Sequence, residues 1–305
     1  GRGVMPSIVC SVGEVLNMGY VVAREKVTST FKMQNTSALT LRYSIQLDSL
    51  SSTRDKDQQR IPSFITSSLQ RTEFVGTQNY NGLSVFSIFP TEGEIGAGKS
   101  QDFTVTFSPD HESLYYSDRL KVVLFGKEMA QVIHLKGAAR DHPMFVEGGV
   151  PLDVPVESLA VTLPTSSQEA LKGGNVLPLT LYYKTRQEPV KSVLLVLEYI
   201  EGESSPAPAV TELKVGSIQS AQFASKKNVE FSFDSLPLLQ QKGFTIEPVK
   251  GTVERGQVKG IGVSWVPPAD FRADDPLHVT ALLTLKCDIK ETYRILFMAK
   301  VVSAY

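Results

Sequence analysis

The chain has 305 residues, 42% of them hydrophobic and 21% charged, and a formal net charge of −1. This length predicts about two domains of roughly 100–200 residues each, with enough apolar side chains for a core in both. The balanced charge argues against a nucleic-acid-binding surface, and no apolar run approaches the roughly 20 residues of a membrane span.

The first residues, Gly1–Met5, lack an initiating Met and the character of a signal peptide, which predicts a piece of a longer protein. Only two cysteines are present, Cys10 and Cys287, and such sparse use favours a reducing compartment over a disulfide framework. Asn35-Thr-Ser37 is a glycosylation sequon that an intracellular chain would leave bare. Cys10 stands among aliphatic residues and is expected to be a small core side chain.

The N-terminal part reads as a series of short strands. Valine-rich segments at 7–12 and 15–22, punctuated by Gly13 and Gly19, predict a bent first strand. Residues 27–33 and 39–47 alternate apolar and polar side chains, which is typical of half-buried strands. Residues 49–82 are mostly polar and predict an exposed loop.

A strand–turn–strand pattern follows over Phe86–Pro109. Pro90 ends the first strand because proline cannot donate to a ladder, and Gly93 and Gly98 are expected at positive φ in the turns. A second alternating strand, Phe103–Phe107, comes next, and residues 120–125 and 131–135 predict a hairpin around Gly126.

The same pattern returns in residues 244–267. Ten positions of this segment lie 158 residues after their counterparts, including Trp265 at the position of Phe107. The sequence therefore predicts two copies of one unit, with domains at 1–140 and 141–305 and a long insertion in the second.

The start of the second copy is set by a weaker match. Residues 177–183 and 193–197 repeat the alternation of residues 27–33 and 43–47 at an offset of 150. A rival register aligns Leu16–Gly19 with Leu213–Gly216, but it leaves residues 150–200 without counterparts. Residues 145–161 predict a proline-broken edge strand, and residues 166–174 predict one short helix.

Short strands, frequent turn signals and little helix predict an all-β protein made of two β-sandwiches. Inward-facing residues are expected at alternate positions of the strands. The predicted core positions are Phe31, Met33, Tyr43, Ile45, Phe103, Val105 and Phe107 in the first domain and Leu181, Tyr183, Leu195, Leu197, Ile261, Val263 and Trp265 in the second.

Several motifs of the first domain resemble those of the ASH family of immunoglobulin-like modules, which is related to major sperm protein. The resemblance lies in Thr30–Ser37, in the Phe86–Gly98 segment, in Phe103–Pro109 and in Ile133–Gly137. The second domain matches mainly over 244–267 and ends more weakly, at Phe297-Met-Ala299. The resemblance implies tandem immunoglobulin-like (ASH/MSP-type) β-sandwiches of a cilia- and flagella-associated protein of the axonemal central apparatus.

The residues themselves predict no enzyme. The four histidines show no metal-ligand spacing, and the glycines at 93, 96 and 98 precede a strand and not a helix, which argues against a phosphate loop. No catalytic residue, metal, cofactor or small-molecule substrate is expected.

The candidate interaction residues are Lys32, Tyr115 and Tyr116. Of two adjacent tyrosines in a strand, one should be exposed and available as an interface anchor. The leading hypothesis is a structural module that binds other axonemal proteins, with microtubule-associated proteins among the candidates, through strand edges and long insertions. The alternative, implied by the resemblance, is an adaptor in which Lys32 contributes to a groove for acidic or phosphorylated peptides.

Overall fold

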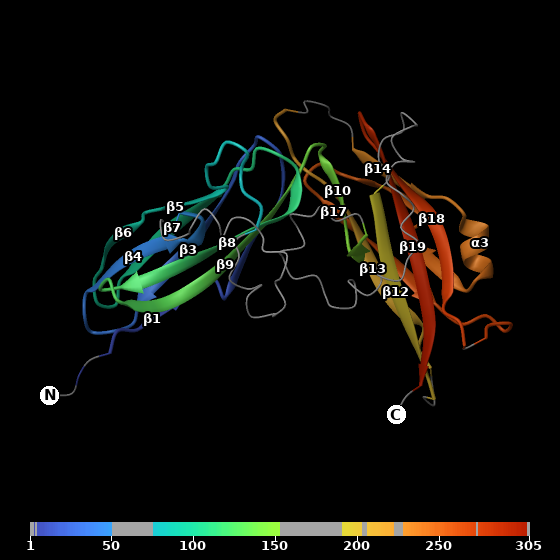
Figure 1. Ribbon diagram of the computed structural model, residues 1–305, viewed down its shortest axis with the longest axis horizontal. Coiled ribbons are helices and arrows are strands. Elements are labelled where there is room, and N and C mark those ends of the chain that lie inside the picture. Colours follow the sequence, from blue (N-terminus) through green and yellow to red (C-terminus); the bar gives the residue numbers. More distant parts are fainter. Residues whose placement is uncertain are drawn as a thin grey trace. The chain divides into compact units, whose positions relative to one another are not determined.

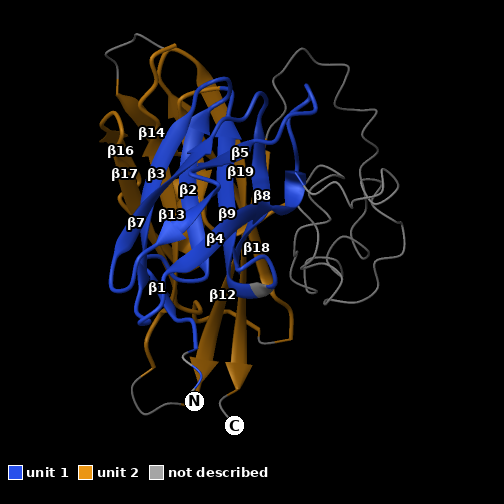
Figure 2. Ribbon diagram, turned by 90° about the vertical axis from the view of Figure 1, so that its left-hand side faces the viewer, with its two compact units in different colours: residues 1–141, 155–162 blue, residues 142–154, 163–305 orange. Residues whose placement is uncertain are grey.

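The structure is a computed structural model that describes residues 3, 5–50, 76–152, 191–202, 206–222, 228–272 and 274–303. The described residues form two compact units, the first ending at Asp141 and the second beginning at His142 (Figures 1 and 2). Each unit is an immunoglobulin-like β-sandwich of two sheets packed around one core, so the predicted fold class is confirmed.

Unit 1 has one four-stranded and one five-stranded sheet. The four-stranded sheet has the order β1 (Ile8–Cys10), β3 (Val27–Asn35), β7 (Ser100–Phe107), β5 (Phe86–Phe89). The five-stranded sheet has the order β2 (Val15–Val22), β9 (Glu128–Arg140), β8 (Ser113–Leu124), β4 (Leu41–Leu47), β6 (Glu92–Ile95). A 3₁₀ turn, η1 (Asp48–Leu50), follows β4. All pairings are antiparallel except that of β2 with β9.

Unit 2 repeats this plan with six strands in its larger sheet. The four-stranded sheet has the order β10 (Met144–Glu147), β13 (Ala209–Ser217), β17 (Val258–Trp265), β15 (Phe244–Glu247). The six-stranded sheet has the order β11 (Val150–Pro151), β12 (Lys191–Glu201), β19 (Lys290–Ser303), β18 (Leu277–Lys286), β14 (Val229–Phe233), β16 (Lys250–Val253). One short helix, α3 (Leu236–Gln241), is described here.

The predicted core positions lie inside the sandwiches. All seven of unit 1 and the five described ones of unit 2 are buried, and Trp265 also donates from Nε1 to the carbonyl of Lys242 at 3.0 Å. Leu181 and Tyr183 lie outside the described residues, as does the predicted helix at 166–174. Side chains of a pleated strand point alternately to its two faces, and the alternating apolar pattern of the sequence therefore predicted these core residues.

The 158-residue repeat is confirmed by the pairing of the strands. Phe86 lies opposite Phe107 in β5 and β7, and Phe244 lies opposite Trp265 in β15 and β17. The turn glycines Gly98 and Gly256 also match, with φ of 71° and 75°.

The offset of 150 is wrong, and so is the rival register. Residues 193–197 belong to β12, which pairs in parallel with β19 as β2 pairs with β9. The counterparts of β3 and β4 are β13 and β14, because β13 pairs with β17 and β14 pairs with β16 and β18. Core strands of one sandwich share the same apolar alternation, so this pattern cannot tell one strand from another.

Gly93 has a different role from the one predicted. It is not among the residues with positive φ; a Cβ at this position would lie 2.7 Å from the hydroxyl of Tyr43 on β4. At the counterpart position Gly251, a Cβ would lie 2.9 Å from the ring of Phe231 on β14. In both units glycine makes room for an aromatic side chain of the neighbouring strand.

Candidate interaction surfaces

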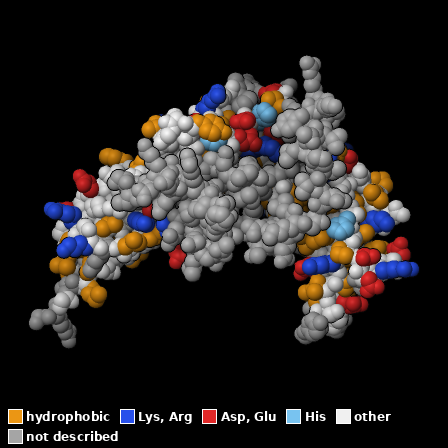
Figure 3. All heavy atoms as spheres, in the orientation of Figure 1, with side chains coloured by type: hydrophobic (Ala, Val, Ile, Leu, Met, Phe, Trp, Pro, Cys, Tyr) orange, Lys and Arg blue, Asp and Glu red, His pale blue; other side chains and the backbone are white. Residues whose placement is uncertain are grey.

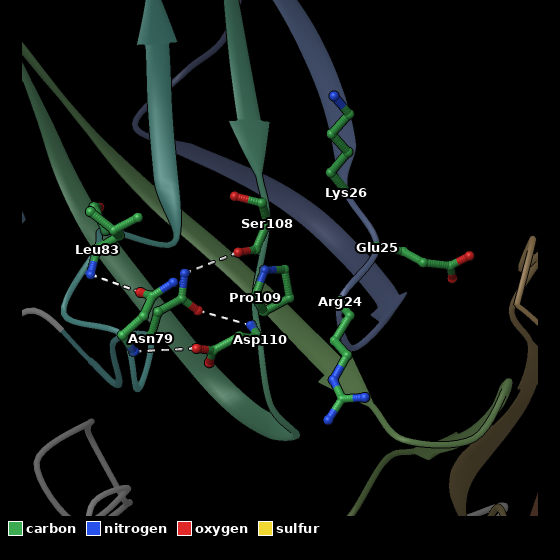
Figure 4. A pocket seen from close by; sticks show the side chains of 10 residues that line it. Arg24, Glu25, Lys26, Asn79, Leu83, Ser108, Pro109 and Asp110 are labelled. Carbon is green, nitrogen blue, oxygen red and sulfur yellow. Dashed lines mark hydrogen bonds between the residues drawn. The ribbon is translucent and has the colours of Figure 1, made fainter.

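A hollow of about 600 Å³ lies at one end of unit 1, between three turns (Figure 4). The turn from β2 to β3, the segment before β5 and the turn after β7 form its walls. Its lining residues are Arg24, Glu25, Lys26, Asn79, Asn81, Leu83, Ser84, Ser108, Pro109 and Asp110. Two basic and two acidic side chains are among them, so the hollow has no strong net charge.

Asp110 and Asn79 hold these turns in place. The carboxylate of Asp110 accepts the backbone N–H of Tyr80 at 3.0 Å, and the backbone N–H of Asp110 donates to Oδ1 of Asn79 at 2.9 Å. Asn79 also donates from Nδ2 to the carbonyl of Ser108 at 3.1 Å (Figure 4). Burial tends to raise the pKa of Asp110, but hydrogen bonds from His111, Tyr80 and Asn81 outweigh it and lower that pKa.

His111 stands beside the hollow in an aromatic cluster. Its Nδ1 lies 2.6 Å from Oδ1 of Asp110, and its ring stacks on Tyr80 with the centroids 3.6 Å apart. Tyr116 meets the His111 ring edge to face and donates its hydroxyl to the His111 carbonyl at 2.6 Å. The His111 Nε2 atom is buried and has no hydrogen-bond partner among the described residues. The arrangement fixes the loop before β5 against the start of β8.

Of the two predicted interface tyrosines, Tyr116 is buried and Tyr115 is half-buried. Tyr116 is 1% exposed and packs edge to face against Phe107. Burial, together with the nearby charge of Asp110, raises the pKa of Tyr116 above its usual range. Tyr115 is half-buried, and its hydroxyl is buried with no partner among the described residues. Tyr116 is therefore not exposed as an anchor, and a role of Tyr115 in an interface stays a prediction.

Lys32 lies on the exposed face of β3. It stands directly opposite Asp102 of β7, which is also exposed, so the strand pair presents both charges together. The backbone N–H of Lys32 donates to Oγ of Ser11 at 2.8 Å. The structure does not bring Lys32 and the two tyrosines together into one site. Lys32 belongs to the four-stranded sheet of unit 1, and both tyrosines belong to its five-stranded sheet.

On the face shown in Figure 3, the described residues carry charges of both signs between hydrophobic side chains. No group of three or more His, Cys, Asp or Glu in the described part could hold a metal ion. Its helices also include none that is long and apolar enough to cross a membrane.

Sequence reasoning missed the cluster of Tyr80, Asp110 and His111. Asp110-His111 directly follows Pro109 and was visible as a pair, but Tyr80 stands thirty residues earlier in a polar segment. Only the pairing of β5 with β7 brings the residues together.

The chain is similar to two curated proteins over nearly its whole length. It is 44% identical over 306 residues to cilia- and flagella-associated protein 74 of mouse and to the human protein of the same name, and these alignments cover 99% of this chain. The chain spans only 16% of the length of each relative. No family model matches the sequence.

Among solved structures, the chain resembles an ASH/PapD-like domain of human CEP192, with 10% identity and a TM-score of 0.30. That match covers 44% of this chain and 85% of the domain. It also resembles WR4, a member of the MSP family from C. elegans, with 12% identity and a TM-score of 0.24, covering 44% of this chain and 97% of WR4.

Proposed function

We propose that this chain is a non-enzymatic structural module that binds other proteins in the ciliary axoneme and contributes to assembly of the central apparatus and to ciliary motility. The observation that supports this proposal best is the 44% identity to cilia- and flagella-associated protein 74 across 99% of the chain. Identity of this extent covers both units and the segments between their strands.

The architecture suits such a role. Among the described strands, each sheet ends in strands that pair on one side only, and an extended segment of another protein can add to an edge of this kind. The balanced charge of the chain, −1 in total, favours specific contacts over a general attraction to nucleic acid or anionic membranes.

Deleting the codons for these 305 residues from the gene that encodes them tests the proposal. In ciliated cells we expect axonemes that lack one or more central-apparatus proteins, measured by quantitative mass spectrometry, and an altered beat in high-speed video. Axonemes of normal composition and normal beat would contradict the proposed role.

A motif-binding adaptor is the second candidate, supported by the exposure of Lys32 on β3. Titration of acidic and phosphorylated peptides against the native chain and Lys32→Glu separates the two functions. The adaptor predicts binding that weakens at least tenfold in Lys32→Glu. Binding that is absent, or equal in both proteins, would eliminate it.

A further inference from the structure

In the part of the chain that the structure describes, one side of strand β12 is unpaired along most of its length. Its neighbour β11 pairs only with Val193 and Leu194. Beyond them, no strand in the described part of the chain pairs with Leu195–Glu201 on the side away from β19. These seven residues, called the β12 edge below, therefore present backbone N–H and C=O groups that have no partner among the described strands.

Among the described strands, only β19 pairs with the far end of β12. The pairing of β18 with β19 begins at Leu277 opposite Ala299, whereas β12 and β19 remain paired as far as Glu201 and Ser303 (Figure 1). The last residues of β12 and β19 thus form a two-stranded parallel ribbon. Parallel pairs are the less stable kind, and a two-stranded ribbon is marginal on its own, so a third strand would stabilise this one.

The corresponding strand of unit 1 has a register shift in its pairing, whereas the pairing of β12 with β19 has none. In β2 the pairing with β9 shifts between Asn17 and Tyr20, where Gly19 has a φ of 75° and its N–H is held by Oδ1 of Asn17 at 2.9 Å. Such a bulge twists an edge strand away from further pairing. The pairing of β12 with β19 runs through eleven residue pairs with no shift. Residues 192–201 also contain no proline, lysine or arginine, the side chains that commonly block an edge.

The β12 edge offers apolar neighbours on both faces of the sheet. Val196 and Ile200 point outward and are 37% and 48% exposed. Leu197 is buried on the inner face, and Tyr199 packs there edge to face with Trp265, the ring centroids being 6.3 Å apart. An added strand would place its side chains alternately beside Val196 and Ile200 on the outer face and beside Leu197 and Tyr199 on the inner face.

The charges favour a different protein over a second copy of this chain. Glu198 is the central residue of the β12 edge, its side chain is 54% exposed, and it lies 3.2 Å from Lys300 of β19. Two copies that pair antiparallel over the whole β12 edge would place Glu198 opposite itself, and like charges directly opposite are destabilising. A basic side chain at that position of the incoming strand would be favourable.

We propose that the β12 edge binds an extended segment of another protein, which adds as a seventh strand to the six-stranded sheet. The segment has apolar side chains on both faces and a lysine or arginine opposite Glu198. The inference rests on the proposed function, because it names the edge through which the module would bind a partner.

Synthetic nine-residue peptides built from valine, isoleucine and threonine are the probes. One has a central lysine, a second a central glutamate, and a third the central lysine flanked by proline, which cannot pair. Each is titrated against the whole 305-residue chain, and hydrogen exchange of the backbone amides reports where it binds. We expect the central-lysine peptide to slow exchange in residues 195–201 and to bind at least tenfold tighter than the other two.

Variants then test the assignment. Ile200→Lys should weaken binding of the central-lysine peptide at least tenfold, whereas Val210→Lys, a matched change at a 73% exposed position of β13, should leave it unchanged. The double variant Glu198→Lys/Lys300→Glu keeps the ion pair with its charges exchanged and should prefer the central-glutamate peptide.

Three results would overturn the proposal: no slowing of exchange in residues 195–201 with any peptide, an unchanged peptide preference in the double variant, or a dimer in sedimentation that protects these amides without peptide. If the Ile200→Lys chain were then still retained in axonemes, the proposed ciliary function would stand and only the assignment of the binding edge would be wrong. If the chain bound the peptides but were absent from axonemes, the assignment of the binding edge would stand and the ciliary role would be wrong.

Discussion

The side-chain amide of Asn35, at the end of β3, donates a hydrogen bond of 2.9 Å to the carbonyl of Ile95, at the end of β6. Asn35 is fully buried, and this bond joins the two sheets of unit 1. Its Nδ2 also donates to Leu39 at 2.6 Å, and its Oδ1 accepts from Ser37 at 2.9 Å. The amide is therefore fully used inside the sandwich, and it is inaccessible to glycosylation in the folded chain.

Replacing this amide should destabilise unit 1. Asn35→Ala leaves the buried carbonyl of Ile95 and the part-buried carbonyl of Leu39 without this donor, so we expect a loss of about 2–4 kcal/mol in the free energy of unfolding. Gln46→Ala, at an exposed position of β4, serves as the control and should change stability by less than about 0.5 kcal/mol. Equal urea denaturation midpoints for the two variants would show that the amide does not hold the sheets together.

The glycine beside an aromatic ring gives a second prediction. In Gly251→Ala the new Cβ would stand 2.9 Å from the buried ring of Phe231, and we expect a loss of about 1–3 kcal/mol from the resulting overpacking. Gly13→Ala is the matched control, since a Cβ there meets nothing within 4 Å. Thermal unfolding of both variants measures the difference, and a Gly251→Ala protein as stable as Gly13→Ala would refute the role given to this glycine.

Asp118 predicts a pH dependence. Its carboxyl is 2% exposed and accepts from the backbone N–H groups of Ser49 and Arg119, at 3.2 and 2.8 Å. Desolvation by burial is the largest cause that raises its pKa above the usual 3.8, with the charge of Asp48 adding to it. A raised pKa in the folded state means that folding favours the protonated form. The stability that this provides is complete below about pH 3.8 and is lost as the pH rises through the folded pKa.

Asp118→Asn removes this titration while keeping an oxygen for the two N–H groups. We therefore expect the native chain to lose stability relative to Asp118→Asn as the pH rises from 3.5 to 7. Urea denaturation of both proteins at several pH values measures the difference. A difference that is constant over this range, or that runs the opposite way, would contradict the assignment.

Arg140 and Glu112 give a fourth prediction. Arg140 is 2% exposed, its Nη1 forms an ion pair with Glu112, and Glu112 also accepts the backbone N–H of Asp141 at 2.9 Å. Glu112→Ala leaves a buried guanidinium with less compensation, so we expect a loss of about 3–5 kcal/mol. Glu92→Ala, an exposed residue of β6, is the control for loss of one negative charge. Similar unfolding free energies for both variants would show that the pair contributes little.

The sequence predicted most of the core and the repeat but not the identity of every strand. The core position of Trp265 could be predicted because its spacing from the neighbouring glycines and prolines is the same as that of Phe107 in unit 1. Turns require these glycines and prolines, so their positions mark the strands between them. Val193–Leu197 was assigned to the wrong strand, since aliphatic alternation is common to every buried strand and the loops between strands differ in length in the two units. The contact of Tyr80 with His111 depends on the pairing of β5 with β7, which local sequence does not encode.

Retention in the axoneme tests the central claim most directly. The 305-residue chain, carrying a fluorescent tag, is expressed in multiciliated cells, and its fluorescence is measured along cilia before and after detergent removes the membrane and soluble proteins. An interaction module of the axoneme predicts signal along the cilium that survives extraction, with the tag alone removed. Complete loss of the signal on extraction, or its absence from cilia in cells that express the chain, would contradict the account.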